Sequence, residues 1–348
     1  MILKQNIAYY LVGIVIVTVL TGCSMIDENL DDCGEQTEIN CELQLITNVS
    51  TEIHTQLNVQ TDATFAEILK SNLSYVFTDF AKDVSLSFYG TTADSTLLYS
   101  DSHIMNDSEH SYTLYIPRRK YFHLALANIE DNSVLKLENA DNCHMTSLHQ
   151  VAADTIESQN TGVFTARQLM EMVEGVDQTF NVRLYMANCA TVLMIDPQGH
   201  DISNMRVFTT GFASAFYIAD SLYEYKKPSP IVRTRKIESN DSRYVGFVSV
   251  NLPSLDPGAR TRTVVETTEP FVAASGEDAL WEFRVYQPQD NGTTTETVLH
   301  INEPLRAGQL KIIKARIGEN GQIESETPNV GVSVTLDWKN GGTFVPDL

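Results

Sequence analysis

The chain has 348 residues, with 45 aspartate and glutamate against 24 lysine and arginine residues and a net charge of −21. Neutralised phosphates supply most of the affinity of nucleic-acid binders, so an acidic chain without a basic stripe excludes nucleic acid as a partner. The length exceeds one ordinary hydrophobic core and predicts two domains. Residues 23–180 hold 7 basic and 25 acidic residues, a sharper imbalance than in the rest, which places the predicted boundary near Phe180.

The first residues have the pattern of a lipoprotein signal peptide. Lys4 precedes a nearly continuous apolar run of fourteen residues, Ile7–Leu20. A membrane-spanning helix needs about 20 apolar residues, so this run indicates a signal peptide that comprises residues 1–22. It ends in Leu20-Thr21-Gly22-Cys23, the pattern of a bacterial lipobox. We expect cleavage before Cys23 and acylation of that residue, palmitate included. The alternatives are an ordinary signal peptide with a chance cysteine and a short anchor helix.

Residues 23–38 form a predicted tether. They carry six acidic residues and no basic one, which is typical of a solvated stretch. Ser24 follows the lipidated cysteine at the position where an aspartate would signal retention in the inner membrane. We therefore expect acylated Cys23 to hold the chain in the lipid of the cell outer membrane, with the protein displayed at the surface.

Period-two alternation and β-branched or aromatic content predict strands through most of the first half. From Phe65 to Phe80 the apolar residues follow helical spacing instead, with Thr61 or Asp62 available as the N-cap. A shorter helix is predicted at Ala166–Val173. The predicted strands are Cys41–Val49, Val84–Tyr89, Ser111–Ile116 and Tyr121–Ile129.

The second half is predicted to consist almost wholly of strands. Residues 318–321 predict a hairpin turn before the last strand. In that last strand five apolar residues alternate with small or polar ones, a pattern that requires one buried face and one solvent-exposed face. Together the halves predict a mainly β fold of two β-sandwich domains in series, residues 39–180 and 181–348, with one or two short helices. The second-half strands are Asn181–Ile195, Met205–Thr210, Tyr244–Asn251, Arg262–Glu266, Ala279–Gln287, Thr295–Ile301, Gln309–Ile317 and Val330–Trp338.

Four cysteines remain after lipidation, and an exported chain meets oxidising conditions in which they can pair. Cys33 and Cys143 lie in polar segments where packing does not need them, and we hypothesise one disulfide between them. Cys41 and Cys189 lie in apolar segments and are expected to be buried. The spacing of the cysteines is not that of a zinc knuckle, so no metal site is predicted.

Motifs for catalysis are missing from the sequence, so we predict no enzyme, no catalytic residue and no cofactor. His144 and His149 are expected at the surface. The basic cluster at residues 118–120 is expected to be a soluble hairpin loop, and a contact for phosphorylated surface glycolipid is the alternative. Trp281 and Trp338 alternate with strand neighbours, which favours core positions over carbohydrate platforms.

Seven short stretches, spread in order over nearly the whole mature chain, share a further pattern. They are Asp31-Asp32-Cys33 with Glu42–Asn48, Val84–Tyr89, Phe180–Cys189, Thr209–Phe212, Ala279–Tyr286, Leu305–Lys314 and Val330–Trp338. Together they resemble the FimB-type fimbrial anchor lipoproteins of Gram-negative anaerobes from gut and mouth. The resemblance implies transthyretin-like β-sandwich domains and a role at the base of a surface fimbrium, fixing it to the outer membrane and limiting its length.

Subunits of such fimbriae assemble by strand exchange, in which a groove accepts a strand from the neighbour. In the polymerising pilins of this family, an arginine-specific protease removes the N-terminal strand together with its lipid. Here the first arginine is Arg118, so no such cleavage point follows Cys23 before it. We expect the lipid and the first strand to stay attached while fimbrial shaft subunits join by β-strand addition. The candidate exchanged strand comprises Val330, Val332, Val334, Leu336 and Trp338; the alternative is that it completes its own domain.

The family's source bacteria also O-glycosylate Asp-Ser/Thr-apolar tripeptides, which predicts modification of Ser95, Thr155 and Ser221. A tip position instead of a base position stays open. The second hypothesis for function is a surface adhesin or glycan-binding lipoprotein, because β-sandwiches in series also serve that purpose.

Overall fold

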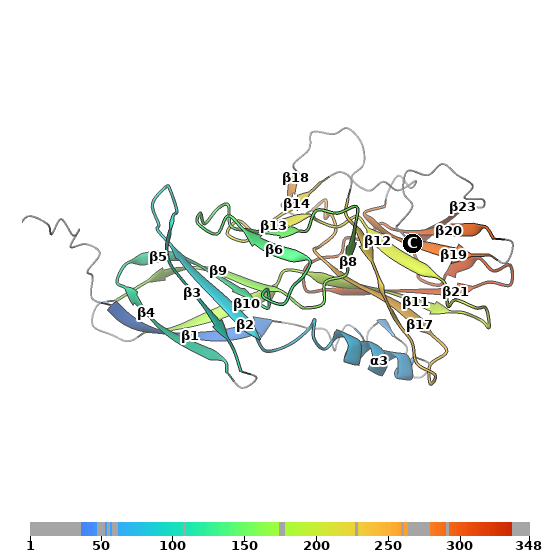
Figure 1. The fold of residues 1–348 in the computed structure, drawn as a ribbon, viewed down its shortest axis with the longest axis horizontal. Helices are drawn as coiled ribbons and strands as arrows, with labels where there is room; N and C mark the ends of the chain where they lie inside the picture. Colours follow the sequence, from blue (N-terminus) through green and yellow to red (C-terminus); the bar gives the residue numbers. More distant parts are fainter. Residues whose placement is uncertain are drawn as a thin grey trace, which may run out of the picture.

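Figure 1 shows the fold in a computed structural model, which describes residues 36–46, 53, 56–57, 62–106, 109–173, 178–226, 229–258, 261–263, 279–289 and 292–335. The molecule is elongated, with the N-terminal strands toward one end and the C-terminal strands toward the other (Figure 1). The predicted fold class, mainly β with β-sandwich domains, is confirmed. Within the described ranges, no helix is both long and apolar enough to cross a membrane.

Seven strands form an N-terminal sheet that bends into a sandwich. Their order is β3-β2-β5-β9-β10-β1-β4. Strands β9 and β10 pair only at Tyr185 with Thr165 and at Met186 with Phe164, so the sheet opens there into two layers. Apolar side chains of both layers fill the space between them. The bounds are β1 (Gln36–Ile46), β2 (Asp83–Tyr89), β3 (Leu97–Ile104), β4 (Ser111–Pro117), β5 (Lys120–Ala127), β9 (Phe164–Glu171) and β10 (Gln178–Met186).

Two further sheets face each other in the C-terminal half, in the orders β16-β17-β11-β21-β22 and β23-β20-β19-β12-β15-β8. Their shared core includes Leu193 and Ile313 from the first sheet and Trp281 and Phe283 from the second. The bounds are β8 (Thr155–Glu157), β11 (Cys189–Asp196), β12 (Arg206–Thr210), β15 (Ile231–Arg233), β16 (Arg235–Ile237), β17 (Val245–Asn251), β19 (Trp281–Pro288), β20 (Thr294–Ile301), β21 (Leu310–Ile317), β22 (Ile323–Ser325) and β23 (Val330–Thr335).

A small sheet of order β18-β14-β13-β7-β6 combines strands from both predicted domains. Its side chains Leu148 and Phe216 share a core with Leu124 and Leu126 of β5, so it covers the outer face of the N-terminal sandwich. The bounds are β6 (Leu135–Glu138), β7 (Ser147–Gln150), β13 (Ala215–Tyr217), β14 (Leu222–Tyr225) and β18 (Thr261–Thr263).

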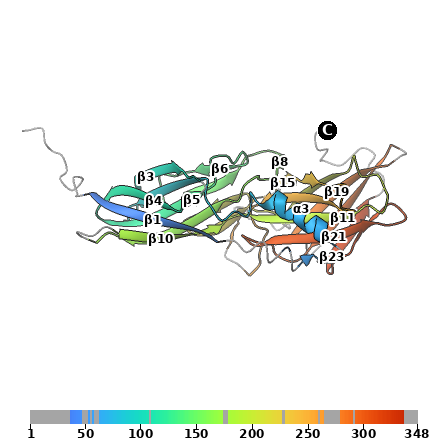
Figure 2. The same cartoon turned by 90° about the horizontal axis from the view of Figure 1, so that it is seen from below.

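The two halves of the chain interlock. Helix α3 (Ala63–Leu73) belongs to the first half but lies across the sheet that contains β11 and β21 (Figure 2). Its Phe65 shares a core with Val248 and Ile312, and Asp62 beside its first turn is 2.6 Å from the Lys314 ammonium group. Strand β8, also from the first half, joins a C-terminal sheet. The predicted boundary at Phe180 falls inside β10.

Three predictions about elements need correction. Ala166–Val173 is not a helix: its first six residues belong to β9, which pairs with β5 at eight consecutive positions from Phe164 to Glu171. Asn181–Ile195 is not one strand but two, β10 and β11; Asn188 between them bonds to Gln159 and Thr161. The turn at residues 318–321 leads into β22 before the chain reaches β23. The predicted helix from Phe65 is confirmed but ends earlier, at Leu73.

Candidate strand-exchange edges

Strand addition requires a strand edge whose main-chain groups are free to pair with a partner. The first strand of the chain has no such edge. β1 lies between β10, with which it pairs in parallel over eight residues, and β4, with which it pairs antiparallel over seven. Its alternate side chains Ile39, Cys41 and Leu43 are buried in the N-terminal core. β1 is therefore an interior strand of its own sheet, next to the edge strand β4.

Among the strands of the described ranges, β23 is the outermost of its sheet and pairs with β20 alone. Val332 lies opposite Leu299, so both side chains point to the same face, toward the core of the C-terminal sandwich. Leu299 is fully buried, whereas Val332 is 39% exposed. The facing sheet ends in β22, which has only three residues and pairs with β21 only from Ala315 onward. The seam where β22 and β23 meet therefore carries an exposed apolar side chain.

A polar cluster on the outer face holds β23 to its neighbours. His300 Nε2 lies 2.9 Å from the Ser333 hydroxyl of β23, and His300 Nδ1 lies 3.4 Å from Glu282 of β19. Glu282 is fully buried and forms an ion pair with Arg284 at 2.7 Å. The contact between His300 and Glu282 lacks hydrogen-bond geometry, so the imidazole is not oriented by the carboxylate as it is in a catalytic triad.

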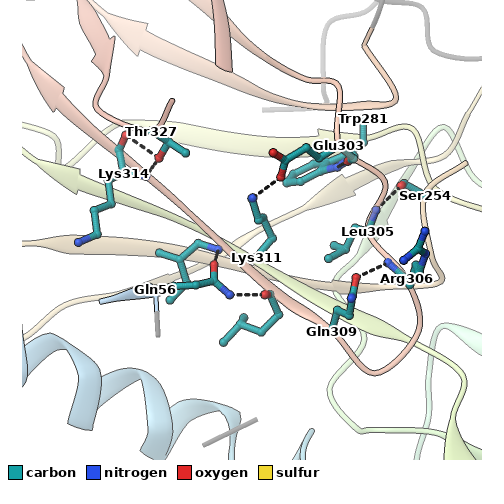
Figure 3. A network of polar contacts seen from close by, with 12 residues as sticks. Gln56, Ser254, Trp281, Glu303, Leu305, Arg306, Gln309, Lys311, Lys314 and Thr327 are labelled. Carbon is teal, nitrogen blue, oxygen red and sulfur yellow. Dashed lines mark hydrogen bonds and ion pairs between the residues drawn. The ribbon is translucent and has the colours of Figure 1, made fainter. Parts of the chain in front are cut away.

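The edge of β21 ahead of its pairing with β22 is closed by side chains (Figure 3). The Gln56 amide donates to the Leu310 carbonyl at 2.6 Å and accepts from the Ile312 amide at 2.8 Å, as a paired strand would. The Lys314 amide donates to the Thr327 hydroxyl at 2.8 Å. These three bonds occupy the main-chain groups that a partner strand would need, so β21 offers a less accessible edge than β23.

Several predicted site residues lie outside the described part of the chain: Cys23, Cys33, Leu336 and Trp338. The main chain of Val334 pairs with Thr297 in β23, while its side chain is outside the described atoms. Val330, also on the candidate strand, packs against the C-terminal core. Val330 and Val332 thus lie on one edge strand of the described sheet, and exchange of this strand stays a prediction.

The expectation that Cys143 sits in a polar loop away from packing is wrong. Its amide donates to the Ser95 carbonyl at 3.0 Å, which ties the loop to the turn before β3, and its thiol is fully buried beside Leu135 and Leu148. Burial raises the pKa of this thiol to about 11. The bridge to Cys33 stays a prediction. Cys41 and Cys189 are buried as predicted, and burial raises the pKa of Cys41 to about 12.

The three predicted glycosylation residues differ in accessibility. Ser221 is exposed in the turn between β13 and β14, and Thr155 is half-buried in β8. Ser95 is only 8% exposed, and its hydroxyl donates to the Thr92 carbonyl at 3.1 Å. Modification of all three stays a prediction, and Ser221 is the best placed of them.

The predicted core tryptophan, basic cluster and surface histidines can each be located in the structure. Trp281 is fully buried, with its indole N–H donating to the Glu303 carbonyl at 2.9 Å, so its predicted core position is confirmed. The basic cluster lies at the turn from β4 to β5, where Arg118 bonds to Thr37 at 2.8 Å. His144 is exposed and His149 is partly buried in β7. Among the described residues, no group of three side chains could hold a metal ion.

Comparison with known proteins identifies relatives by fold. No protein-family model matches the sequence, and no curated protein matches it significantly. A Bacteroides thetaiotaomicron protein described provisionally as polysaccharide-binding is 10% identical, with a TM-score of 0.51 over 85% of this chain and 97% of that one. A provisional adhesin from Bacteroides ovatus is 8% identical, with a TM-score of 0.51 over 87% of this chain and 97% of that one. The fimbrial anchor protein Mfa2 from Porphyromonas gingivalis is 10% identical, with a TM-score of 0.44 over 85% and 97%. The first two show that the fold extends over nearly the whole length of those proteins.

Proposed function

We propose that the protein is an outer-membrane lipoprotein that anchors a surface fimbrium and helps to assemble it by β-strand addition. The observation that carries this proposal is the position of β1. It is an interior strand that pairs with β10 on one side and β4 on the other. No arginine occurs between Cys23 and Arg118 at which an arginine-specific protease could release it. The fold shared with a provisional Bacteroides adhesin supports a role at the cell surface.

Retention of β1 limits the edges of the subunit at which a neighbouring subunit can add a strand. Removal of β1 would leave a groove between β10 and β4 lined by the partners of Ile39 and Leu43, and a neighbour's strand could fill it. With β1 in place, that groove is closed and the subunit accepts no strand there. Growth then proceeds only from another edge, and acylated Cys23 holds the subunit in the membrane. This combination is what the base of a fimbrium requires.

The β23 edge is where we place the contact with the first shaft subunit. A partner strand could pair with the outer main-chain groups of β23, which no strand of the described ranges occupies, and cover the exposed Val332 at the seam with β22. Main-chain hydrogen bonds would supply strength, and alternate side chains would supply specificity.

The test is co-purification from native outer membranes in mild detergent, followed by mass spectrometry of the bound proteins. We expect fimbrial shaft subunits to be enriched over a mock purification from a deletion strain. Enrichment of no fimbrial subunit, in cells that display fimbriae, would contradict the assembly role.

A further inference from the structure

A cavity of about 380 Å³ lies where the turn and strands of β13 and β14 overlie the corner between β9 and β10. Its lining includes Arg167 of β9, Arg183 and Tyr185 of β10, and Ser221 and Tyr223 of the β13–β14 hairpin, and contains no acidic residue. Sites for small ligands are typically about 300–1,000 Å³, so the volume is at the small end of that range.

The two arginines line the same cavity from neighbouring strands. β9 and β10 pair only at Tyr185 with Thr165 and at Met186 with Phe164, and the cavity lies where the two strands part. Alternation places Arg183 on the face of Tyr185 and Arg167 on the face of Thr165. Two guanidinium groups that share one cavity repel each other. An anion bound between them would remove that cost.

No carboxylate of the described residues neutralises either arginine. Arg183 is exposed and forms no hydrogen bond or ion pair with any residue of those ranges. Within the same ranges, the Arg167 guanidinium donates to the Ala219 carbonyl, a neutral acceptor, and to no carboxylate. In a chain of net charge −21, a cavity with two guanidinium groups and no carboxylate is an exception that requires an explanation.

The rest of the cavity has the features of a sugar site. Tyr223 is held rigidly, since its hydroxyl donates to the Ala187 carbonyl at 2.9 Å and its ring stacks on Phe216 at 4.5 Å. The Tyr185 side chain is 55% exposed and offers an aromatic face and a hydroxyl beside Arg183. Arginine binds carboxylates through paired N–H donors in a planar fork. The cavity volume suits one or two sugar rings. An extended peptide is a poorer fit, because it would bind best through main-chain hydrogen bonds to a free strand edge.

We propose that this cavity binds a sugar that carries a carboxylate. Arg167 and Arg183 hold the carboxylate between β9 and β10, and Tyr185 covers the sugar ring. The site uses none of the groups assigned above to strand addition, so a test of sugar binding is independent of the anchoring role.

Calorimetric titration of the full-length lipoprotein in detergent tests the site. The probes are glucuronic acid and N-acetylneuraminic acid, with glucose and galactose as neutral counterparts and a glutamate-rich peptide as an acidic non-sugar. We expect the acidic sugars to bind and the binding to weaken as salt is raised. Arg183→Gln should weaken it about tenfold or more, since it removes charge-assisted hydrogen bonds. Arg183→Lys should keep part of the affinity.

The matched control is Arg206→Gln, which removes an equal charge from an exposed position on β12 outside the cavity. It should leave binding unchanged. Equal binding of neutral and acidic sugars, no binding of any sugar, or unchanged binding by Arg183→Gln would each overturn the proposal. Binding of the acidic peptide in place of the sugars would overturn the assignment of the ligand class.

Discussion

Replacing Val332 by lysine tests whether a partner strand docks at the β23 edge. Val332 is 39% exposed in the free chain. Full burial of a valine side chain contributes about 1.5–3 kcal/mol, so losing the buried part costs the fold about 1–2 kcal/mol. The long lysine stem can cover the same apolar surface while its ammonium group reaches water, which lowers that cost. The substituted chain is therefore expected to fold.

The effect on assembly should be much larger. A strand added to β23 would cover position 332, and an ammonium group buried there without a partner costs several kcal/mol. We expect Val332→Lys to weaken the association with the shaft subunit about a hundredfold, which corresponds to about 3 kcal/mol. The assay is the recovery of shaft subunits in a detergent pull-down, together with a count of surface fimbriae by electron microscopy.

Ile104→Lys provides the matched control. Ile104 is an apolar residue at the end of β3, an edge strand of the other sandwich, and is 62% exposed. It should leave recovery and fimbrial number unchanged. Urea unfolding of both variants checks that each is folded. Normal fimbriation and normal recovery with a folded Val332→Lys protein would refute the role of this edge.

Two predictions concern stability. His123 is fully buried beside Phe88, and burial lowers its pKa from 6.5 to about 4, so the unfolded chain binds a proton between these values that the folded chain does not. The unfolding free energy should therefore fall by about 2 kcal/mol from pH 7 to pH 5. His123→Phe should remove this part of the pH dependence, as measured by urea unfolding at several pH values. An unfolding free energy that changes with pH equally in the variant and the parent chain would contradict the prediction. At Gly211 φ is +101°, and a Cβ would lie 2.6 Å from Trp281 Cα, whereas Gly199, with φ of +85°, has no atom within 4 Å of that position. Gly199→Ala should lower the free energy of unfolding by about 1–2 kcal/mol, measured by thermal unfolding. Gly211→Ala should lower it by at least about 2 kcal/mol more, because its Cβ would also clash with Trp281. Equal losses in the two variants would show that this clash does not matter.

The sequence is most informative where strands are long and have a buried face. Gln309–Ile317, Tyr244–Asn251 and Thr295–Ile301 are each predicted within one residue of β21, β17 and β20. In these strands apolar residues recur for the full length of the element, so the pattern alone identifies them. Strands of three residues, such as β13, β16 and β22, contain too few alternations to be recognised.

The features that the sequence does not reveal depend on contacts between residues that are far apart along the chain. The segment Ala166–Val173 has helix-compatible apolar spacing, yet pairing with β5 makes it strand β9. The closure of the β21 edge depends on Gln56, which is 254 residues from Leu310 along the chain. Arg167 and Arg183 line one cavity because β9 and β10 pair beside it, which the sequence does not show. In contrast, the candidate edge strand from Val330 is identifiable because its alternation is local.

We expect the lipid, the tether and β1 to remain one continuous chain in the assembled fimbrium. Mass spectrometry of the N-terminal peptide, released from subunits in native outer membranes, tests it most directly. We predict a peptide that begins at an acylated Cys23 and continues without interruption into β1. A native N-terminus without acyl chains, or one that begins downstream of β1, would contradict the account.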